Sequence, residues 1–136
     1  MYSVLMVDDN YYWVNFMRSL IDEVLPTHLY RFDHCDNLKD AITWIDAIDR
    51  STPCLLLLDN LIPSALDPAD HIENGSERIL AYIGPVPPHW RVLVMSVSWW
   101  LQAESHAGDP RIIGVDKGTS VDEIKKTLTS LLGIAT

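Results

Sequence analysis

Aspartates, a serine and a lysine stand directly after short apolar runs of this sequence. Asp8 and Asp9 follow the first run, and Asp59 follows four consecutive leucines. Two later runs lead into Ser96 and Lys117. If these runs are strands of an open parallel sheet, the residues that follow them gather at the edge where such sheets bind ligands. We therefore expect the five side chains to meet in one crevice.

Three carboxylates in one crevice repel each other unless a cation lies among them. A hard divalent cation, Mg²⁺ being the usual cellular choice, binds carboxylate oxygens and keeps coordination positions open for phosphate oxygens. The ammonium group of Lys117 and the hydroxyl group of Ser96 suit the negative charge of a phosphoryl group in transfer. Asp59, at the end of the run expected to be the central strand, is the best-placed carboxylate nucleophile. The pattern indicates magnesium-dependent phosphoryl transfer.

The apolar runs alternate with longer amphipathic segments, which is typical of strands covered by helices on both faces. Four runs are clear and a fifth is weaker and more polar, as an edge strand would be; the four are residues 4–7, 55–58, 92–95 and 112–115, and the fifth lies around residues 29–32. The order is (βα)5. Right-handed crossovers then predict an α/β fold with a doubly wound, five-stranded parallel sheet.

Helical stripes occupy the segments between the strands. The sequence predicts them at residues 14–24, 38–48 and 79–83, and only a poor, short helix at residues 99–105. A capping box at residues 120–123 predicts a final helix, closed by Gly133. Its expected core face consists of Val121, Ile124, Leu128 and Leu131.

The composition fits one domain over residues 1–136. With 19 acidic and 10 basic residues, the formal charge of −9 disfavours direct binding to nucleic acids or to anionic membranes. Cys35 and Cys54 form no metal-binding pattern and are expected to be reduced core residues. Neither a signal peptide nor a membrane-spanning run is evident, so we expect a cytoplasmic protein.

The pair Asp8–Asp9, the segment 55–63, Ser96 and Lys117 together resemble the receiver domains of bacterial response regulators. The resemblance covers nearly the whole chain and implies a flavodoxin-like (βα)5 sandwich. It implies phosphorylation of Asp59 and a Mg²⁺ ion held by Asp8, Asp9, Asp59 and the backbone carbonyl of Leu61. Ser96 and Lys117 would hold the phosphoryl oxygens.

The resemblance also implies partners. A sensor histidine kinase or a phosphotransfer protein would donate the phosphoryl group, and a downstream effector protein or domain would respond to it. A homodimer is a further candidate, with Trp99 and Trp100 as an output surface. We expect no enzymatic activity apart from Mg²⁺-dependent self-phosphorylation and autodephosphorylation.

Two positions depart from the family's pattern. Gly118 follows Lys117 where proline is usual, and Gly114 stands where an aromatic switch residue is usual. Together with the poor fourth helix at residues 99–105, they motivate an alternative, a receiver-like interaction module that signals without phosphorylation. A phosphatase of the haloacid-dehalogenase type is disfavoured, because Asn10 stands where that family needs an acid.

Simpler interpretations also exist for individual residues. Asp8 and Asp9 could be no more than helix caps, Ser96 could be no more than a turn former, and Lys117 could be a solvated charge. His71 and the acidic residues around it are better explained as a polar loop than as a second metal site, and we assign no site there.

Overall fold

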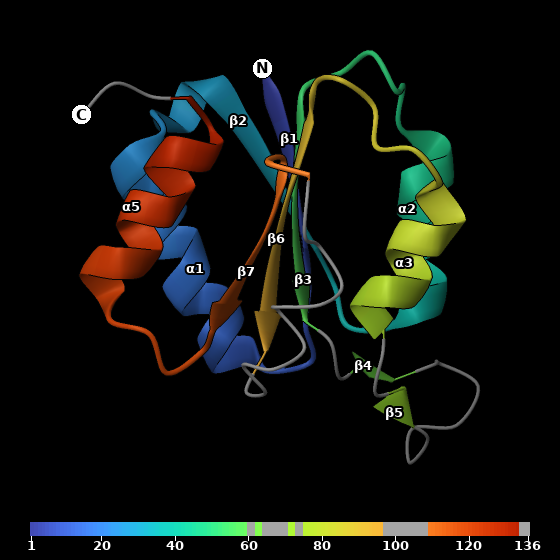
Figure 1. Ribbon diagram of the computed structural model, residues 1–136, viewed down its shortest axis with the longest axis horizontal. Coiled ribbons are helices and arrows are strands. Elements are labelled where there is room, and N and C mark those ends of the chain that lie inside the picture. The colour runs from blue at the N-terminus through green and yellow to red at the C-terminus, as the bar shows by residue number, and fades with distance from the viewer. Residues whose placement is uncertain (60–61, 64–70, 73–74, 97–108, 134–136) are drawn as a thin grey trace.

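A five-stranded parallel sheet with helices on both faces forms the body of the molecule (Figure 1). The computed structural model describes residues 1–59, 62–63, 71–72, 75–96 and 109–133. The strand order β2-β1-β3-β6-β7 confirms the predicted doubly wound α/β fold. The strands are β1 (Tyr2–Val7), β2 (Tyr30–Cys35), β3 (Cys54–Asp59), β6 (Trp90–Ser96) and β7 (Ile112–Asp116).

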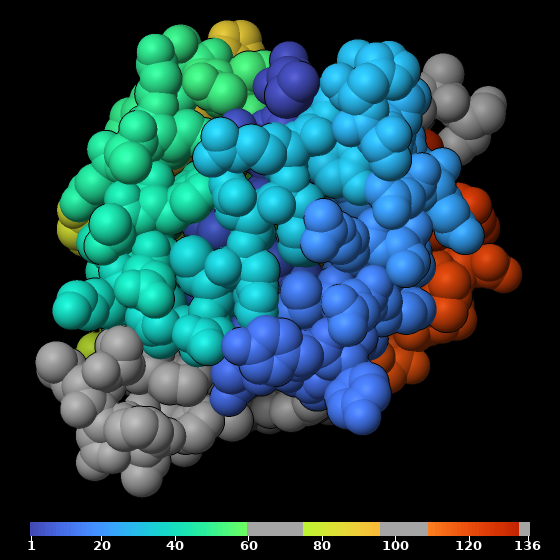
Figure 2. Space-filling model, turned by 180° about the vertical axis from the view of Figure 1, so that it is seen from behind, coloured from blue at the N-terminus to red at the C-terminus, as the bar shows by residue number. Residues whose placement is uncertain are grey.

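The apolar character of each strand follows its place in the sheet. All six residues of the central strand β3 are buried, because helices cover both of its faces. The edge strand β2 is more polar and begins at Tyr30, slightly later than predicted. Leu29 instead ends a short 3₁₀ turn, Thr27–Leu29, and is 44% exposed. Seen from behind, β2 lies between α1 and α2 at the surface (Figure 2).

In the described part of the chain, two α-helices pack on each face of the sheet. Helices α1 (Tyr11–Val24) and α5 (Val121–Leu131) cover one face, and α2 (Leu38–Ala47) and α3 (Gly75–Ile83) cover the other (Figure 1). Each face of the sheet contributes to its own hydrophobic core. Among the described residues, no helix is long and apolar enough to cross a membrane.

The ends of the helices follow the signals in the sequence. The side chains of Asn10, Asn37 and Ser120 accept hydrogen bonds from backbone N–H groups in the first turns of α1, α2 and α5. Gly84 and Gly133 follow α3 and α5 with φ angles of 73° and 70°, a left-handed conformation that glycine adopts without strain.

One residue of the predicted core face of α5 is not in the core. Val121 is 49% exposed, whereas Ile124, Leu128 and Leu131 are buried as expected. Val121 is the first residue of the helix, and helical side chains tilt toward the N-terminus. Its side chain therefore points past the end of the helix instead of onto the sheet.

The segment predicted to be a polar loop contains a small antiparallel pair of strands, β4 (Ile62–Pro63) and β5 (His71–Ile72). The pair lies below the carboxyl ends of the main strands (Figure 1). The short helix expected at residues 99–105 lies outside the described residues.

Candidate functional site

Three carboxylates meet at the carboxyl edge of the sheet. Asp8 directly follows β1, Asp59 ends β3, and Val7 lies beside Leu58 in the register of these neighbouring strands. Oxygen atoms of Asp8, Asp9 and Asp59 all lie within 4.8 Å of one another. Asp8 is completely buried, Asp59 is 7% exposed and Asp9 is exposed. The structure thus brings together the three aspartates singled out in the sequence.

Lys117 reaches this cluster from the turn after β7. Its Nζ atom lies 2.8 Å from Oδ2 of Asp8 and 3.4 Å from Oδ2 of Asp59. The side chain of Lys117 is only 16% exposed. Its interpretation as a solvated charge is therefore wrong.

A tight turn at Asp116 to Thr119 aims Lys117 at the carboxylates. Oδ1 of Asp116 accepts a hydrogen bond from the Gly118 backbone N–H at 2.7 Å, and the Asp116 carbonyl accepts one from the Thr119 N–H at 2.9 Å. A Cβ atom at position 118 would lie 3.1 Å from that same Oδ1 atom. Glycine allows the carboxylate to close over the turn, which gives Gly118 a structural role.

Asp8 is held from several sides. Its Oδ1 atom accepts a hydrogen bond from the Asn10 backbone N–H at 2.9 Å, while Oδ2 faces Lys117. Its backbone carbonyl accepts a hydrogen bond from Nε2 of His34 at 2.7 Å. The side chain of Asn10 caps α1 through the N–H groups of Tyr12 and Trp13. The interpretation of Asp8 as only a helix cap is therefore wrong, because Asn10 is the capping residue.

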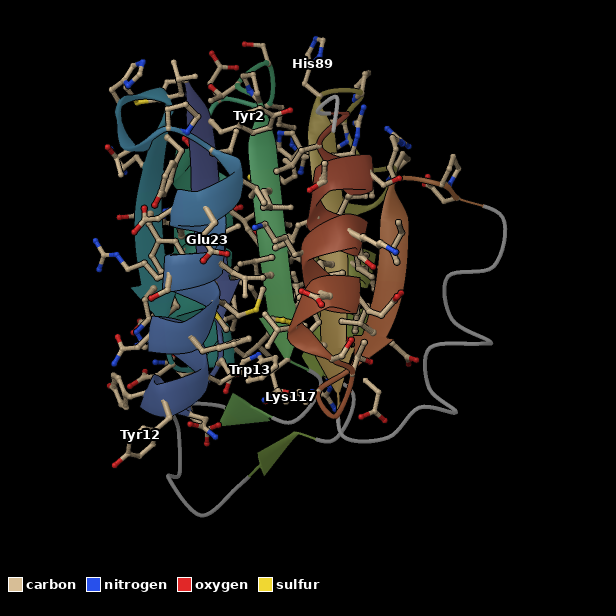
Figure 3. All side chains as sticks on the ribbon, turned by 90° about the vertical axis from the view of Figure 1, so that its left-hand side faces the viewer. Tyr2, Tyr12, Trp13, Glu23, His89 and Lys117 are labelled. Carbon is tan, nitrogen blue, oxygen red and sulfur yellow. The ribbon has the colours of Figure 1, made fainter. Side chains whose placement is uncertain are left out.

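His34 and Trp13 are neighbours of the site that the sequence analysis did not single out. His34 lies on the edge strand β2, and its ring meets the ring of Tyr11 edge to face at 5.2 Å. The carboxylate of Asp36 beside Tyr11 raises the pKa of that phenol. Trp13 lies in the first turn of α1 with its ring 5.5 Å from Nζ of Lys117, and the two labelled side chains adjoin in Figure 3. Only their contacts in the folded chain mark these residues, His34 with the backbone carbonyl of Asp8 and Trp13 with Lys117.

Four other predicted site residues are described in part or not at all. The backbone of Ser96 ends β6 and pairs with Asp116, so it lies at the same edge of the sheet as the carboxylates. The side chain of Ser96 is outside the described part of the chain. Leu61, Trp99 and Trp100 lie outside the described residues altogether.

The chemistry of the cluster fits a divalent cation. Three carboxylates lie together in this cluster, and the ammonium group of Lys117 lies against two of them, Asp8 and Asp59. All the ligand atoms are oxygens, which hard cations such as Mg²⁺ prefer. The exposed Asp9 leaves the cluster open to solvent on one side. Asp8, Asp9 and Asp59 could hold such an ion.

Comparisons with known proteins identify the fold. No protein-family model matches the chain, and a search of the curated proteins finds no match. Among solved structures, the response regulator protein TrrA of Thermotoga maritima, in complex with Mg²⁺–BeF, is 19% identical with a TM-score of 0.69. That alignment covers 97% of this chain and 100% of TrrA.

Two further structures are similar. The signal receiver domain of an HD domain-containing protein from Pseudomonas fluorescens is 15% identical, with a TM-score of 0.67 over 96% of this chain and 94% of that chain. RcsB of Salmonella enterica serovar Typhimurium, bound to the promoter rprA, is 16% identical with a TM-score of 0.67. Here the alignment covers 96% of this chain and 61% of RcsB. The chain therefore has the fold of response-regulator receiver domains, as the residues at its strand ends predict.

Proposed function

We propose that this chain is a phosphoacceptor domain of a histidine-to-aspartate phosphorelay, in which phosphorylation of Asp59 switches the binding of a partner. The observation that carries the proposal is the contact of Lys117 with both Asp8 and Asp59 inside a cluster of three aspartates. A structural ion pair needs one carboxylate, whereas phosphoryl transfer needs a nucleophile, a cation site and a positive group together.

Asp59 is the proposed nucleophile. One of its carboxylate oxygens attacks the phosphorus atom of a phosphohistidine, the new P–O bond forms as the P–N bond breaks, and the imidazole departs. The product is an acyl phosphate on Asp59. A phosphoryl donor can approach from the side of the exposed Asp9, since Asp8 is closed off by protein.

The other residues supply charge and orientation. Lys117 lies close enough to Asp59 for its ammonium group to meet the negative charge on the phosphoryl oxygens. Asp8 holds Lys117 at 2.8 Å and thereby keeps the ammonium group at the site. Asp8, Asp9 and Asp59, with the backbone carbonyl of Leu61, are the proposed ligands of Mg²⁺. When bound, this ion would neutralise charge that gathers during transfer. Ser96 is the proposed second group on the phosphoryl oxygens.

The partners and the location are part of the same proposal. A sensor histidine kinase or a phosphotransfer protein supplies the phosphoryl group in the cytoplasm, and an effector protein or domain, or a second copy of the chain, reads the switch. The alignment covers only 61% of RcsB, whose structure contains a promoter, and this supports an effector that binds DNA. The net charge of −9 supports a receiver that does not itself bind nucleic acid, so the effector would make any such contact. Self-phosphorylation and autodephosphorylation are the only activities proposed for the chain itself.

The test is phosphorylation by acetyl phosphate, followed by the mass of the intact protein. We expect one phosphoryl adduct with Mg²⁺ present, none in EDTA, and loss of the adduct on treatment with hydroxylamine, which cleaves acyl phosphates. An Asp59→Asn variant should take no label. Asp46→Asn is the matched control, because Asp46 is an exposed aspartate of α2 that accepts a hydrogen bond from the Tyr82 hydroxyl. This variant should be labelled like the parent.

Two results would contradict the proposal. Equal labelling of the Asp59→Asn variant would refute Asp59 as the acceptor. A parent protein that takes no label from acetyl phosphate or from phosphorylated kinases would favour the module that signals without phosphorylation. Gly114, which lies beside Val94 in the sheet and has no side chain to switch, already motivates that alternative.

A further inference from the structure

Lys117 has a third contact in addition to its two carboxylates. Its Nζ atom lies 5.5 Å from the centroid of the Trp13 ring, within the range in which a cation is attracted to an aromatic face. Trp13 belongs to α1 and Lys117 to the turn after β7, so the contact joins two distant parts of the chain (Figure 3).

The indole ring of Trp13 is itself held in place. It stacks on Phe16 with ring centroids 5.0 Å apart and an angle of 27° between the ring planes. Its Nε1–H group donates to Sδ of Met95 at 3.3 Å. Met95 lies beside Asp59 in the register of β6 and β3. The ring is thus anchored to the strand next to the proposed nucleophile.

The aromatic contact differs from the ionic ones in what competes for it. The oxygens of Asp8 and Asp59 that face Lys117 belong to the carboxylates that could also hold a divalent cation. When those oxygens turn toward a cation, the ammonium group loses part of its ionic anchorage. The face of Trp13 is no ligand for a hard cation, so its attraction for the ammonium group persists.

We infer that Trp13 is a positioning residue that keeps the ammonium group of Lys117 over the acidic cluster when the carboxylates bind other partners. The inference rests on the proposed phosphoacceptor function and adds a residue to it. In this role Trp13 acts on the reaction through Lys117.

The first experiment tests the contact without any phosphorylation. Protons above an indole ring are shifted upfield, so the ε-methylene signals of Lys117 should lie upfield in an NMR spectrum of the protein with ¹³C-labelled lysine. Lys117→Gln identifies these signals by their loss. The upfield shift should disappear in Trp13→Leu and remain in Trp44→Leu. Trp44 is a matched control, being a partly buried tryptophan whose Nε1–H donates to Asp33 on the other face of the sheet.

The second experiment tests the consequence for the reaction. The rate of labelling by acetyl phosphate and Mg²⁺ should fall about five-fold in Trp13→Leu, the order expected for loss of one partly buried cation–π contact. Trp13→Phe keeps an aromatic face and should stay within about two-fold of the parent. In a Lys117→Gln background, where no ammonium group remains, adding Trp13→Leu should lower the residual rate no further.

Each result has a distinct meaning. If the upfield shift is absent from the parent, or if folded Trp13→Leu is labelled at the parental rate, the inference is overturned. A further loss of rate in the Lys117→Gln background would show that Trp13 acts on the site by general packing, which also overturns it. The upfield shift can be present and removed only by Trp13→Leu while the parent takes no phosphoryl label. In that case the contact stands but the proposed function fails. The use of the contact in phosphoryl transfer is then refuted.

Discussion

At the scale of single residues, the pair of Asp8 and Lys117 decides the character of the site. Asp8 is completely buried, and both of its carboxylate oxygens have partners. A buried carboxylate without a counter-charge is strongly unfavourable, so Lys117 stabilises the apo protein as well as serving the proposed chemistry. This double role explains why the lysine is largely shielded from solvent.

We predict that Lys117→Met lowers the free energy of unfolding in EDTA by about 3 kcal/mol, because it leaves Asp8 buried and unpaired. Urea unfolding measures this loss. Lys125→Met is the control, since Lys125 is 45% exposed and pairs with Glu23 at 3.4 Å on the surface. Its effect should be no more than about 0.5 kcal/mol. Mg²⁺ should restore part of the loss in Lys117→Met by neutralising Asp8. Equal effects of the two variants would contradict the prediction.

At the scale of elements, the connection from β1 to α1 performs two tasks in three residues. Asp8 and Asp9 turn toward the site, and Asn10 starts the helix by accepting hydrogen bonds from the backbone N–H groups of Tyr12 and Trp13 at 3.1 and 3.2 Å. Asn10 stands where phosphatases of the haloacid-dehalogenase type need an acid, and here it is the capping residue of α1. The cap also determines where Trp13 lies, because Trp13 is in the first turn of α1.

We predict that Asn10→Ala destabilises the protein by about 1 kcal/mol, since the first turn of α1 loses its side-chain acceptor. Asn10→Ser keeps an acceptor and should restore most of the stability. Asn15→Ala is the matched control: Asn15 is exposed inside the same helix, where alanine is the better helix former, so that variant should be slightly more stable. Thermal and urea unfolding measure the order of stability of the three variants. A loss in Asn15→Ala as large as in Asn10→Ala would contradict the role of the cap.

At the scale of the whole molecule, the sheet separates two cores and carries the site at one of its edges. Cys54 begins the central strand inside one core, and Cys35 ends the edge strand, with β1 between the two strands. Neither cysteine is in a disulfide, and Cys54 is buried in the core as predicted, whereas Cys35 is only partly buried at its margin. Burial raises the pKa of the Cys54 thiol to about 12 and that of the Cys35 thiol to about 11.

We predict that the raised pKa values of these two thiols cause a loss of stability in alkali. In the unfolded chain a thiol releases its proton near its ordinary pKa of 9.0, while the folded protein still holds it. The stabilisation is therefore complete below pH 9.0 and declines as the pH rises toward the folded-state pKa of about 12 for Cys54 and about 11 for Cys35. The decline should approach about 1 kcal/mol per pH unit for each thiol.

Urea unfolding between about pH 8 and pH 11 measures this slope. Cys54→Ala should flatten it, whatever the variant's stability at neutral pH, and Cys35→Ala should flatten it as well. The double variant should have the shallowest slope of the three. An unchanged slope in Cys54→Ala would show that other groups cause the alkaline loss.

The sequence by itself determined the five strands of the main sheet, their order along the chain and the residues at the ends of these strands. Short runs such as the four leucines before Asp59 are typical of strands buried on both faces, and the capping box that begins at Ser120 is a local signal. These features depend on neighbours a few residues away, which a sequence shows directly. For this reason Asp8, Asp9, Asp59 and Lys117 could be proposed together before the fold was described.

Only the tertiary structure decided which of these groups touch. The contact of Lys117 with Asp8 joins residues 109 positions apart, and it depends on the lateral order of the strands and on the turn that Asp116 and Gly118 form. The contact of Trp13 with Lys117 depends on how α1 packs against the sheet. Helical periodicity likewise placed Val121 on the core face, although the end of the helix leaves it exposed. Such contacts follow from the packing of the whole chain, since a side chain's own sequence neighbours do not determine which distant residues surround it.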